Sequence, residues 1–214
     1  MSGLRLRACA VGLAVVAGLT SGGCTSDIGP PEDPFPGALA ASSLKVDSPA
    51  LRALKQDAGV VDCPASDAAA DPVEDGLPAI TLPCLGGGVD VHLAGLRGTP
   101  MVLNLWASWC GPCREELPVL QEFSERAGDE LLVLGVDFED PSPAAALQLL
   151  EESGVTYPQV ADFDKAIDRA LLRHGLPLTV LVDEQGAIAR VLPIRIDSAD
   201  QLAVEVAESL GVEV

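Results

Sequence analysis

Basic side chains are scarce in this sequence. Its 214 residues include 13 Lys and Arg against 32 Asp and Glu, which gives a formal net charge of −19 at pH 7. A surface of this sign repels phosphate backbones and anionic lipid headgroups, so we expect no nucleic-acid partner. Solubility is the simplest interpretation of the acidity, which does not by itself indicate a basic protein partner.

The sequence also has few groups that could bind a metal. It contains one Cys-x-x-Cys pair, Cys110 and Cys113, whereas a zinc site of this type needs a second such pair or two suitably spaced histidines. The two histidines, His92 and His174, show no such spacing and receive no catalytic role. We therefore expect no metal and no cofactor, with a zinc site as an alternative that metal analysis would test.

The N-terminal apolar run is too short to span a bilayer. It extends from Ala8 to Leu19 after Arg5 and Arg7, about a dozen residues against the roughly 20 of a transmembrane helix. This arrangement predicts a signal peptide over residues 1–23 and action outside the cytoplasm.

Cys24 directly follows the small residues Ser21-Gly22-Gly23, a sequence that resembles a bacterial lipobox. Lipoboxes usually carry an apolar residue three positions before the cysteine, where this chain has Ser21. We predict that Cys24 carries a lipid and tethers the protein to the membrane. Ordinary signal cleavage, which would leave Cys24 as a free thiol, is the alternative.

Two further cysteines, Cys63 and Cys84, remain outside the signal, the lipid site and the Cys-x-x-Cys pair. An even pair in an exported protein predicts a structural disulfide, which would add about 3 kcal/mol of stability. Two unpaired, buried cysteines are the alternative.

The composition, with 48% hydrophobic and 21% charged residues, predicts one packed domain with accessory segments. Residues 24–75 are expected to form a tether and accessory segment. It includes a proline-rich stretch at 29–37 and a short helix that Ser48 caps and Pro49 begins. The compact domain is predicted over residues 76–214.

Strand and helix patterns alternate in this domain, which predicts an α/β fold with a central mixed sheet flanked by helices. The expected strands are 89–93, 101–106, 131–138, 178–182 and 187–194, the last two as a hairpin. The expected helices are about 111–127, a segment between Ser142 and Gly154, about 164–174, and a segment from Ser198 through Leu210.

Cys110 and Cys113 stand where the strand 101–106 is expected to lead into a helix. A spacing of three places both sulfur atoms on one helix face, and the helix N-terminus favours a thiolate at Cys110. We therefore predict that Cys110 is the more exposed, nucleophilic thiol and Cys113 the buried, resolving thiol.

The stretch Leu103-Asn104-Leu105-Trp106-Ala107-Ser108-Trp109-Cys110-Gly111-Pro112-Cys113-Arg114-Glu115-Glu116-Leu117-Pro118 resembles the active-site segment of the extracytoplasmic, thioredoxin-like TlpA/ResA group. The similarity covers roughly Ala79 to Val206. It implies a thioredoxin-like fold and a membrane-tethered thiol–disulfide oxidoreductase. Members of this group usually reduce protein disulfides, so the resemblance implies a reductant. It also implies cytochrome c apoprotein as the client and a membrane-embedded electron donor. We expect a monomer.

The resemblance also assigns two sites outside the cysteines. Gly175-Leu176-Pro177 matches the family's cis-proline loop, in which Leu176 would offer its backbone to a substrate peptide. Leu178 follows the proline, where the family often has Thr. Glu116 matches an acidic residue that influences thiol titration, although a plain acid in the first helical turn is the alternative.

The position six residues before Cys110 holds Asn104, which cannot ionise as the Asp of classical thioredoxins does. Any internal base must therefore come from elsewhere, which directs attention to Glu116. Trp109 is expected at the rim of the site, where it would contact substrate, and Trp106 in the core.

Two other functions remain as alternatives. A thiol peroxidase would use one reactive cysteine preceded by a Pro-x-x-x-Thr-type loop, and no such loop precedes Cys110. A partner-binding or haem-chaperone module would leave the thiols idle, so a dithiol-exchange assay separates it from an oxidoreductase.

Overall fold

The computed structural model describes residues 45–167 and 175–214. The predicted signal peptide, Cys24 and most of the helix predicted over 164–174 lie outside these residues. Within them, none of the helices has the length and apolar character to cross a membrane.

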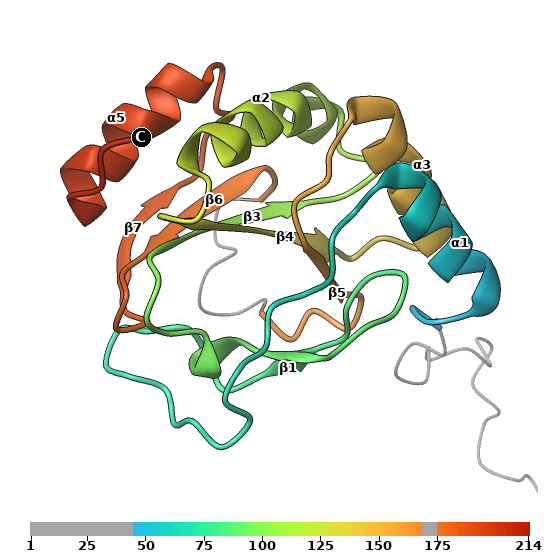
Figure 1. The fold of residues 1–214 in the computed structure, drawn as a ribbon, viewed down its shortest axis with the longest axis horizontal. Helices are drawn as coiled ribbons and strands as arrows, with labels where there is room; N and C mark the ends of the chain where they lie inside the picture. The colour runs from blue at the N-terminus through green and yellow to red at the C-terminus, as the bar shows by residue number, and fades with distance from the viewer. Residues whose placement is uncertain (1–44, 168–174) are drawn as a thin grey trace, which may run out of the picture. The chain divides into compact units, whose positions relative to one another are not determined.

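A five-stranded mixed sheet forms the centre of the protein, with the strand order β5-β4-β3-β6-β7 (Figure 1). Its strands are β3 (Met101–Trp106), β4 (Leu132–Phe138), β5 (Gln159–Asp162), β6 (Leu178–Val182) and β7 (Ile188–Leu192). Strands β3, β4 and β5 are parallel, whereas β6 is antiparallel to β3 and to β7. This is the predicted thioredoxin-like arrangement.

Four described helices cover one face of the sheet: α1 (Pro49–Ala58), α2 (Gly111–Ala127), α3 (Pro143–Ser153) and α5 (Ala199–Leu210) (Figure 1). The opposite face carries the small β1–β2 hairpin (Thr81–Leu82 and Val91–His92) and a 3-10 turn at Leu93–Gly95. Alternate residues of β3 therefore pack into two different layers of the core, one on each face of the sheet. Val102 and Trp106 pack under the helices, while Leu103 and Leu105 face the hairpin.

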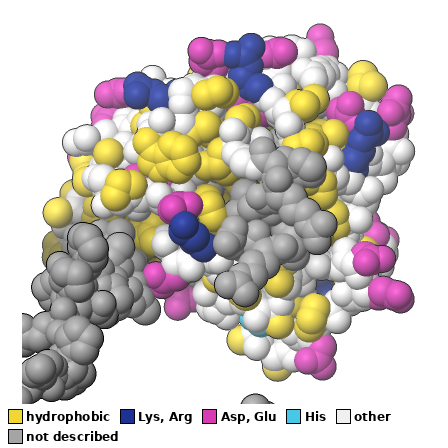
Figure 2. Space-filling view, turned by 180° about the vertical axis from the view of Figure 1, so that it is seen from behind, with side chains coloured by type: hydrophobic (Ala, Val, Ile, Leu, Met, Phe, Trp, Pro, Cys, Tyr) yellow, Lys and Arg dark blue, Asp and Glu magenta, His cyan; other side chains and the backbone are white. Residues whose placement is uncertain are grey.

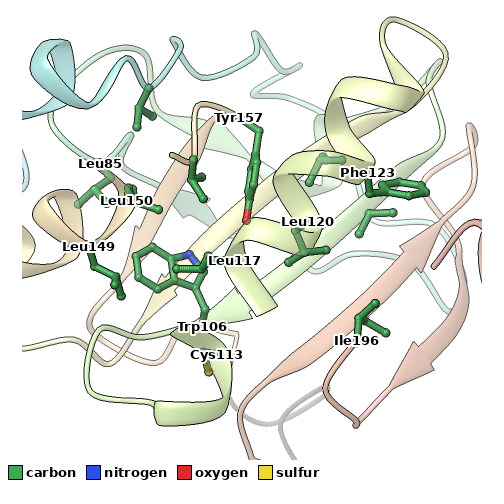
Figure 3. Close-up of a cluster of buried hydrophobic side chains, with 14 of the residues drawn as sticks. Leu85, Trp106, Cys113, Leu117, Leu120, Phe123, Leu149, Leu150, Tyr157 and Ile196 are labelled. Atoms are coloured by element: carbon green, nitrogen blue, oxygen red, sulfur yellow. The ribbon is translucent and has the colours of Figure 1, made fainter. Parts of the chain in front are cut away.

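The helix side of the core is built from large side chains of α2, α3 and the sheet (Figure 3). Leu117, Leu120 and Phe123 project from α2 and are fully buried, and Trp106 lies in the same cluster. The apolar face predicted for this helix is therefore the one that packs. Burial of these large side chains anchors α2, whose N-terminus carries the cysteine pair.

The helix starts follow the predicted caps. The hydroxyl groups of Ser48, Ser142 and Ser198 each accept a hydrogen bond from the backbone N–H three residues later, at 3.2 Å. Such caps satisfy N–H groups that a helix leaves unpaired in its first turn. They fix where α1, α3 and α5 begin.

The strand predictions were incomplete. Strands β1 and β5 were not expected, and the predicted strand 89–93 is only Val91–His92 followed by the 3-10 turn. All four residues of β5 are buried, and two of them, Gln159 and Asp162, are polar, so neither alternation nor an apolar run marks this strand.

Acidic side chains stand out around the edge of the face seen in Figure 2, while hydrophobic side chains gather across its upper part. The net negative charge is therefore not spread evenly over this face. Some apolar surface is exposed among the described residues of this face, as is usual for a folded protein.

Candidate active site

Cys110 and Cys113 form a disulfide at the N-terminus of α2, with their Cα atoms 5.3 Å apart. Cys110 is the N-cap residue, and its sulfur accepts a hydrogen bond from the Cys113 N–H at 3.3 Å. Pro112 lies in the first turn, where a missing N–H costs nothing. The same backbone group can stabilise a thiolate on Cys110 after reduction.

The two sulfur-bearing residues differ in exposure as predicted. Cys110 is 5% exposed and Cys113 is fully buried, so an incoming thiol or disulfide meets Cys110 first. Trp109, beside it, is 57% exposed and donates its indole N–H to the Glu139 carbonyl oxygen at 3.1 Å. The rim position expected for Trp109 and the core position of Trp106 are both confirmed.

Asp140 holds the loop that precedes the cysteines, a role that sequence reasoning missed. Its carboxylate accepts hydrogen bonds from the Ser108 N–H at 2.6 Å and the Ser142 N–H at 3.0 Å. The loops after β3 and β4 are thereby joined through one side chain. Nearby Asp137 is buried, and desolvation together with the negative charge of Asp140 raises its pKa well above the usual range.

Glu116 is completely buried one turn after Cys113. Its carboxylate accepts hydrogen bonds from the Ile196 N–H at 2.7 Å and the Asn104 amide at 3.0 Å. Burial raises the pKa of Glu116 to about 7, with a smaller contribution from the charge of Asp197, while the two hydrogen bonds oppose the shift. Such a group can take or give a proton near neutral pH, unlike a solvated acid.

Asn104, which bonds this carboxyl group, has a second buried polar residue opposite it in the sheet. Asn104 and Thr179 are direct partners in the β3–β6 ladder, and both are fully buried. Within the described residues, the Asn104 Oδ1 and Thr179 Oγ1 atoms have no hydrogen-bond partner. After a flip of its amide, Asn104 could accept a hydrogen bond from a protonated Glu116, so the site can accommodate both charge states of the carboxyl group.

The peptide bond between Leu176 and Pro177 is cis, as the resemblance implied. Strand β6 runs antiparallel to β3, with Leu178 opposite Leu105. The loop before β6 therefore lies at the end of the sheet where β3 leads to the cysteines. Pro177 is buried and Leu176 is half-buried. The fold therefore brings this loop to the same end of the sheet as Cys110.

Cys63 and Cys84 form the predicted second disulfide, with Cα atoms 5.9 Å apart. It connects the segment after α1 to the edge of the sheet, since Cys84 forms an isolated bridge with Val160 of β5. Among the described residues, no group of three or more His, Cys, Asp and Glu side chains is arranged to hold a metal ion.

Known proteins resemble this chain in sequence. It is 33% identical over 111 residues to the thiol:disulfide interchange protein DsbE of Pseudomonas fluorescens biotype C, covering 52% of this chain and 61% of that protein. It is 29% identical over 108 residues to the thiol-disulfide oxidoreductase ResA of Bacillus subtilis, covering 49% and 59%. The chain thus spans less than two thirds of the length of these relatives.

A solved structure supports the same assignment. The DsbF homologue of Corynebacterium diphtheriae superposes with a TM-score of 0.54 and 28% sequence identity, covering 71% of this chain and all of that one. The family model described as Redoxin matches residues 72–201, which is more than half of the chain. The fold, the cysteine pair and these similarities together show that the chain belongs to the Redoxin family, as a ResA- and DsbE-like member with a thioredoxin fold.

Proposed function

We propose that this protein is a thiol–disulfide oxidoreductase that acts outside the cytoplasm and reduces disulfides in client proteins. The observation that carries the proposal is the Cys110–Cys113 disulfide at the start of α2, with Cys110 slightly exposed and Cys113 fully buried. The relatives named for this activity support it.

In the reduced protein, the Cys110 thiolate attacks one sulfur of a client disulfide. A mixed disulfide forms, and the other client sulfur leaves as a thiolate. Cys113 then loses its proton and attacks the Cys110 sulfur, which closes the Cys110–Cys113 bond and releases the second client thiolate. The client gains two electrons and two protons, and a dithiol donor must reduce the protein again.

Glu116 is the proposed acceptor of the Cys113 proton. The two residues lie three positions apart on one face of α2, and with a pKa of about 7 Glu116 can exchange a proton at neutral pH. The Asn104 amide and the Ile196 N–H donate hydrogen bonds that stabilise the ionised carboxylate. Both donors are uncharged, so they do not neutralise it.

The location and partners are further parts of the proposal. The N-terminal apolar segment and the Cys63–Cys84 disulfide suit an oxidising compartment, and acylation of Cys24 would hold the protein at the membrane near an embedded electron donor. By resemblance to the TlpA/ResA group, the client is cytochrome c apoprotein. Deletion of the gene should then impair cytochrome c maturation, and unaffected maturation would remove this client.

Paired substitutions of the two cysteines test the reaction. We expect Cys110→Ser to abolish reduction of insulin by dithiothreitol, because it removes the attacking sulfur. Cys113→Ser should instead accumulate mixed disulfides, because the resolving sulfur is missing, and non-reducing gels with mass spectrometry would identify the captured clients. Efficient turnover by the Cys110→Ser protein would contradict the assigned roles.

A further inference from the structure

A buried lysine lies against the second disulfide. Lys55, on the inner face of α1, is 5% exposed. Its ammonium nitrogen is 3.4 Å from the Cys84 sulfur, 2.9 Å from the Gly87 carbonyl oxygen and 3.0 Å from an Asp62 carboxylate oxygen. A purely structural bridge needs no charged neighbour, and burying an ammonium group is costly unless it has partners.

Each sulfur of this bridge already has the polar partner that its reduced form would require. A thiolate on Cys84 would face the Lys55 ammonium group, which favours the charged form. A thiol on Cys63 would face the Gln159 carbonyl oxygen at 3.1 Å, to which it can donate its proton. These contacts stabilise the reduced pair, and a stabilised reduced form makes a disulfide easier to reduce.

The bridge has the same asymmetry of exposure as the Cys110–Cys113 pair. Cys63 and Cys110 are each 5% exposed, while Cys84 is 1% exposed and Cys113 fully buried. Asp62 and Pro64, on either side of Cys63, line a cavity of about 560 Å³ that lies between this segment, the end of α2 and the start of β4. The cavity thus reaches the two neighbours of Cys63 in the chain, and Cys63 is the more exposed cysteine of the bridge, whereas Cys84 faces the lysine.

We propose that Cys63–Cys84 is a second redox-active disulfide, reduced by a dithiol that attacks Cys63 while Cys84 leaves as a thiolate paired with Lys55. The attacking thiolate bonds to the Cys63 sulfur and the Cys63–Cys84 bond breaks. The second thiol of the reductant then attacks the mixed disulfide and frees Cys63, which takes up a proton. Two electrons pass to the protein, and the dithiol becomes a disulfide.

Reduction of the folded protein tests this inference. In the full-length Cys110→Ser/Cys113→Ser variant, the second bridge is isolated from the active-site pair. After equilibration with dithiothreitol at several ratios of reduced to oxidised reagent, peptide-resolved alkylation would report the fraction of Cys63–Cys84 that is open. Circular dichroism of the same samples would report folding. We expect the bridge to open while the protein remains folded, and opening only in denaturant would overturn the proposal.

Substitutions with opposite expected signs test the role of Lys55. In the same background, Lys55→Met should shift the equilibrium about tenfold or more towards the disulfide, because the charge that stabilises the thiolate is lost. Asp62→Asn should shift the equilibrium towards the dithiol, because the Asp62 carboxylate competes with the Cys84 thiolate for the Lys55 ammonium group. The Asp62 side chain is 89% exposed, so this substitution should not disturb the packing. Lys45→Met, at an exposed site, is the control and should change nothing. Equal equilibria for the Lys55 and Lys45 variants would refute the proposal, and the Asp62 variant decides the matter if Lys55→Met fails to fold.

Discussion

Glu116 occupies the protein interior with two neutral hydrogen-bond donors, Asn104 and Ile196, as its partners. Its pKa is raised from the ordinary 4.5 to about 7, chiefly by burial. The folded protein therefore binds a proton at this site between these pH values, whereas the unfolded chain does not. By linkage, the free energy of unfolding falls as the pH rises through this range and levels off above about 7.

The raised pKa of Glu116 predicts how the variant Glu116→Gln should behave. The neutral amide removes the titration, so the variant should be more stable than the wild type by up to about 3 kcal/mol at pH 8, with the advantage shrinking towards pH 5. The new amide can accept from Ile196 and, after a flip of the Asn104 amide, donate to the free Asn104 oxygen. Urea denaturation of the oxidised proteins from pH 5 to 8 would measure the difference.

The exposed Glu122, also on α2, supplies the matched control, since Glu122→Gln should follow the wild-type curve at every pH. The same pair of variants separates catalysis from stability. Disulfide exchange by Glu116→Gln should lose the pH dependence that the wild type shows around pH 7. Parallel stability curves for Glu116→Gln and the wild type would contradict the raised pKa.

Single residues of this site differed in how far the sequence could predict them. The chemistry of Cys110 and Cys113 follows from their spacing at the start of a helix. This spacing is a local feature of the chain, so the sequence shows it directly. The burial of Glu116 is not local, because it depends on the loop around Ile196 closing over the first turn of α2. Asp140 was missed for a similar reason, since its partner Ser108 is 32 residues away in the chain.

At the scale of elements, a polar side chain of β5 reaches across β4 to the next strand, β3. Gln159 of β5 lies opposite Gly135 of β4 and accepts a hydrogen bond from the Trp106 indole at 2.9 Å. A Cβ atom at position 135 would overlap the Gln159 amide. Glycine is therefore required here by close approach, and it allows Trp106 to be buried with its N–H satisfied.

A double-mutant cycle tests this arrangement. Gly135→Ala should lower the free energy of unfolding by at least about 2 kcal/mol, because the methyl group displaces Gln159 and leaves the Trp106 N–H unpaired. Gln159→Ala removes the obstacle, so adding Gly135→Ala to it should cost much less. A coupling energy of at least about 1 kcal/mol in chemical denaturation would confirm the contact, and simple additivity would disprove it.

The strand β5 also shows why the element pattern was only partly predictable. The longer strands β3 and β4 are mostly apolar, with Asn104 and Asp137 as the exceptions, and were recognised with nearly correct ends. Strand β5 has four residues, and two of them are polar. Gln159 bonds Trp106, 53 residues away in the chain, while Asp162 accepts a hydrogen bond from the nearby Ile167 N–H. No local pattern marks such a strand, since its stability comes from the tertiary contacts.

At the scale of the whole molecule, the segment before the predicted domain start packs against the domain. Leu51 and Val60 belong to the helix-side core, and α1 contacts α3. The Val61 N–H donates to the Thr156 carbonyl oxygen at 2.9 Å, next to the point where Cys63 is bonded to Cys84. The disulfide therefore fastens this segment to the sheet edge, and its loss should loosen α1 before the rest.

The double variant Cys63→Ala/Cys84→Ala should lower the free energy of unfolding by about 3 kcal/mol relative to the oxidised wild type. The bridge joins residues 21 positions apart, so breaking it restores the conformational entropy of a loop of that size to the unfolded chain. Urea denaturation without reductant would measure the loss. Hydrogen exchange should show the loss first as reduced protection of the α1 amides, because α1 and the segment after it depend most on the bridge.

Full reduction supplies the control. In a Cys110→Ser/Cys113→Ser background, it should bring the proteins with and without Cys63 and Cys84 close together in stability. A difference that persists after reduction would mean that the cysteine side chains stabilise the fold by packing, and the cross-link itself would then contribute little.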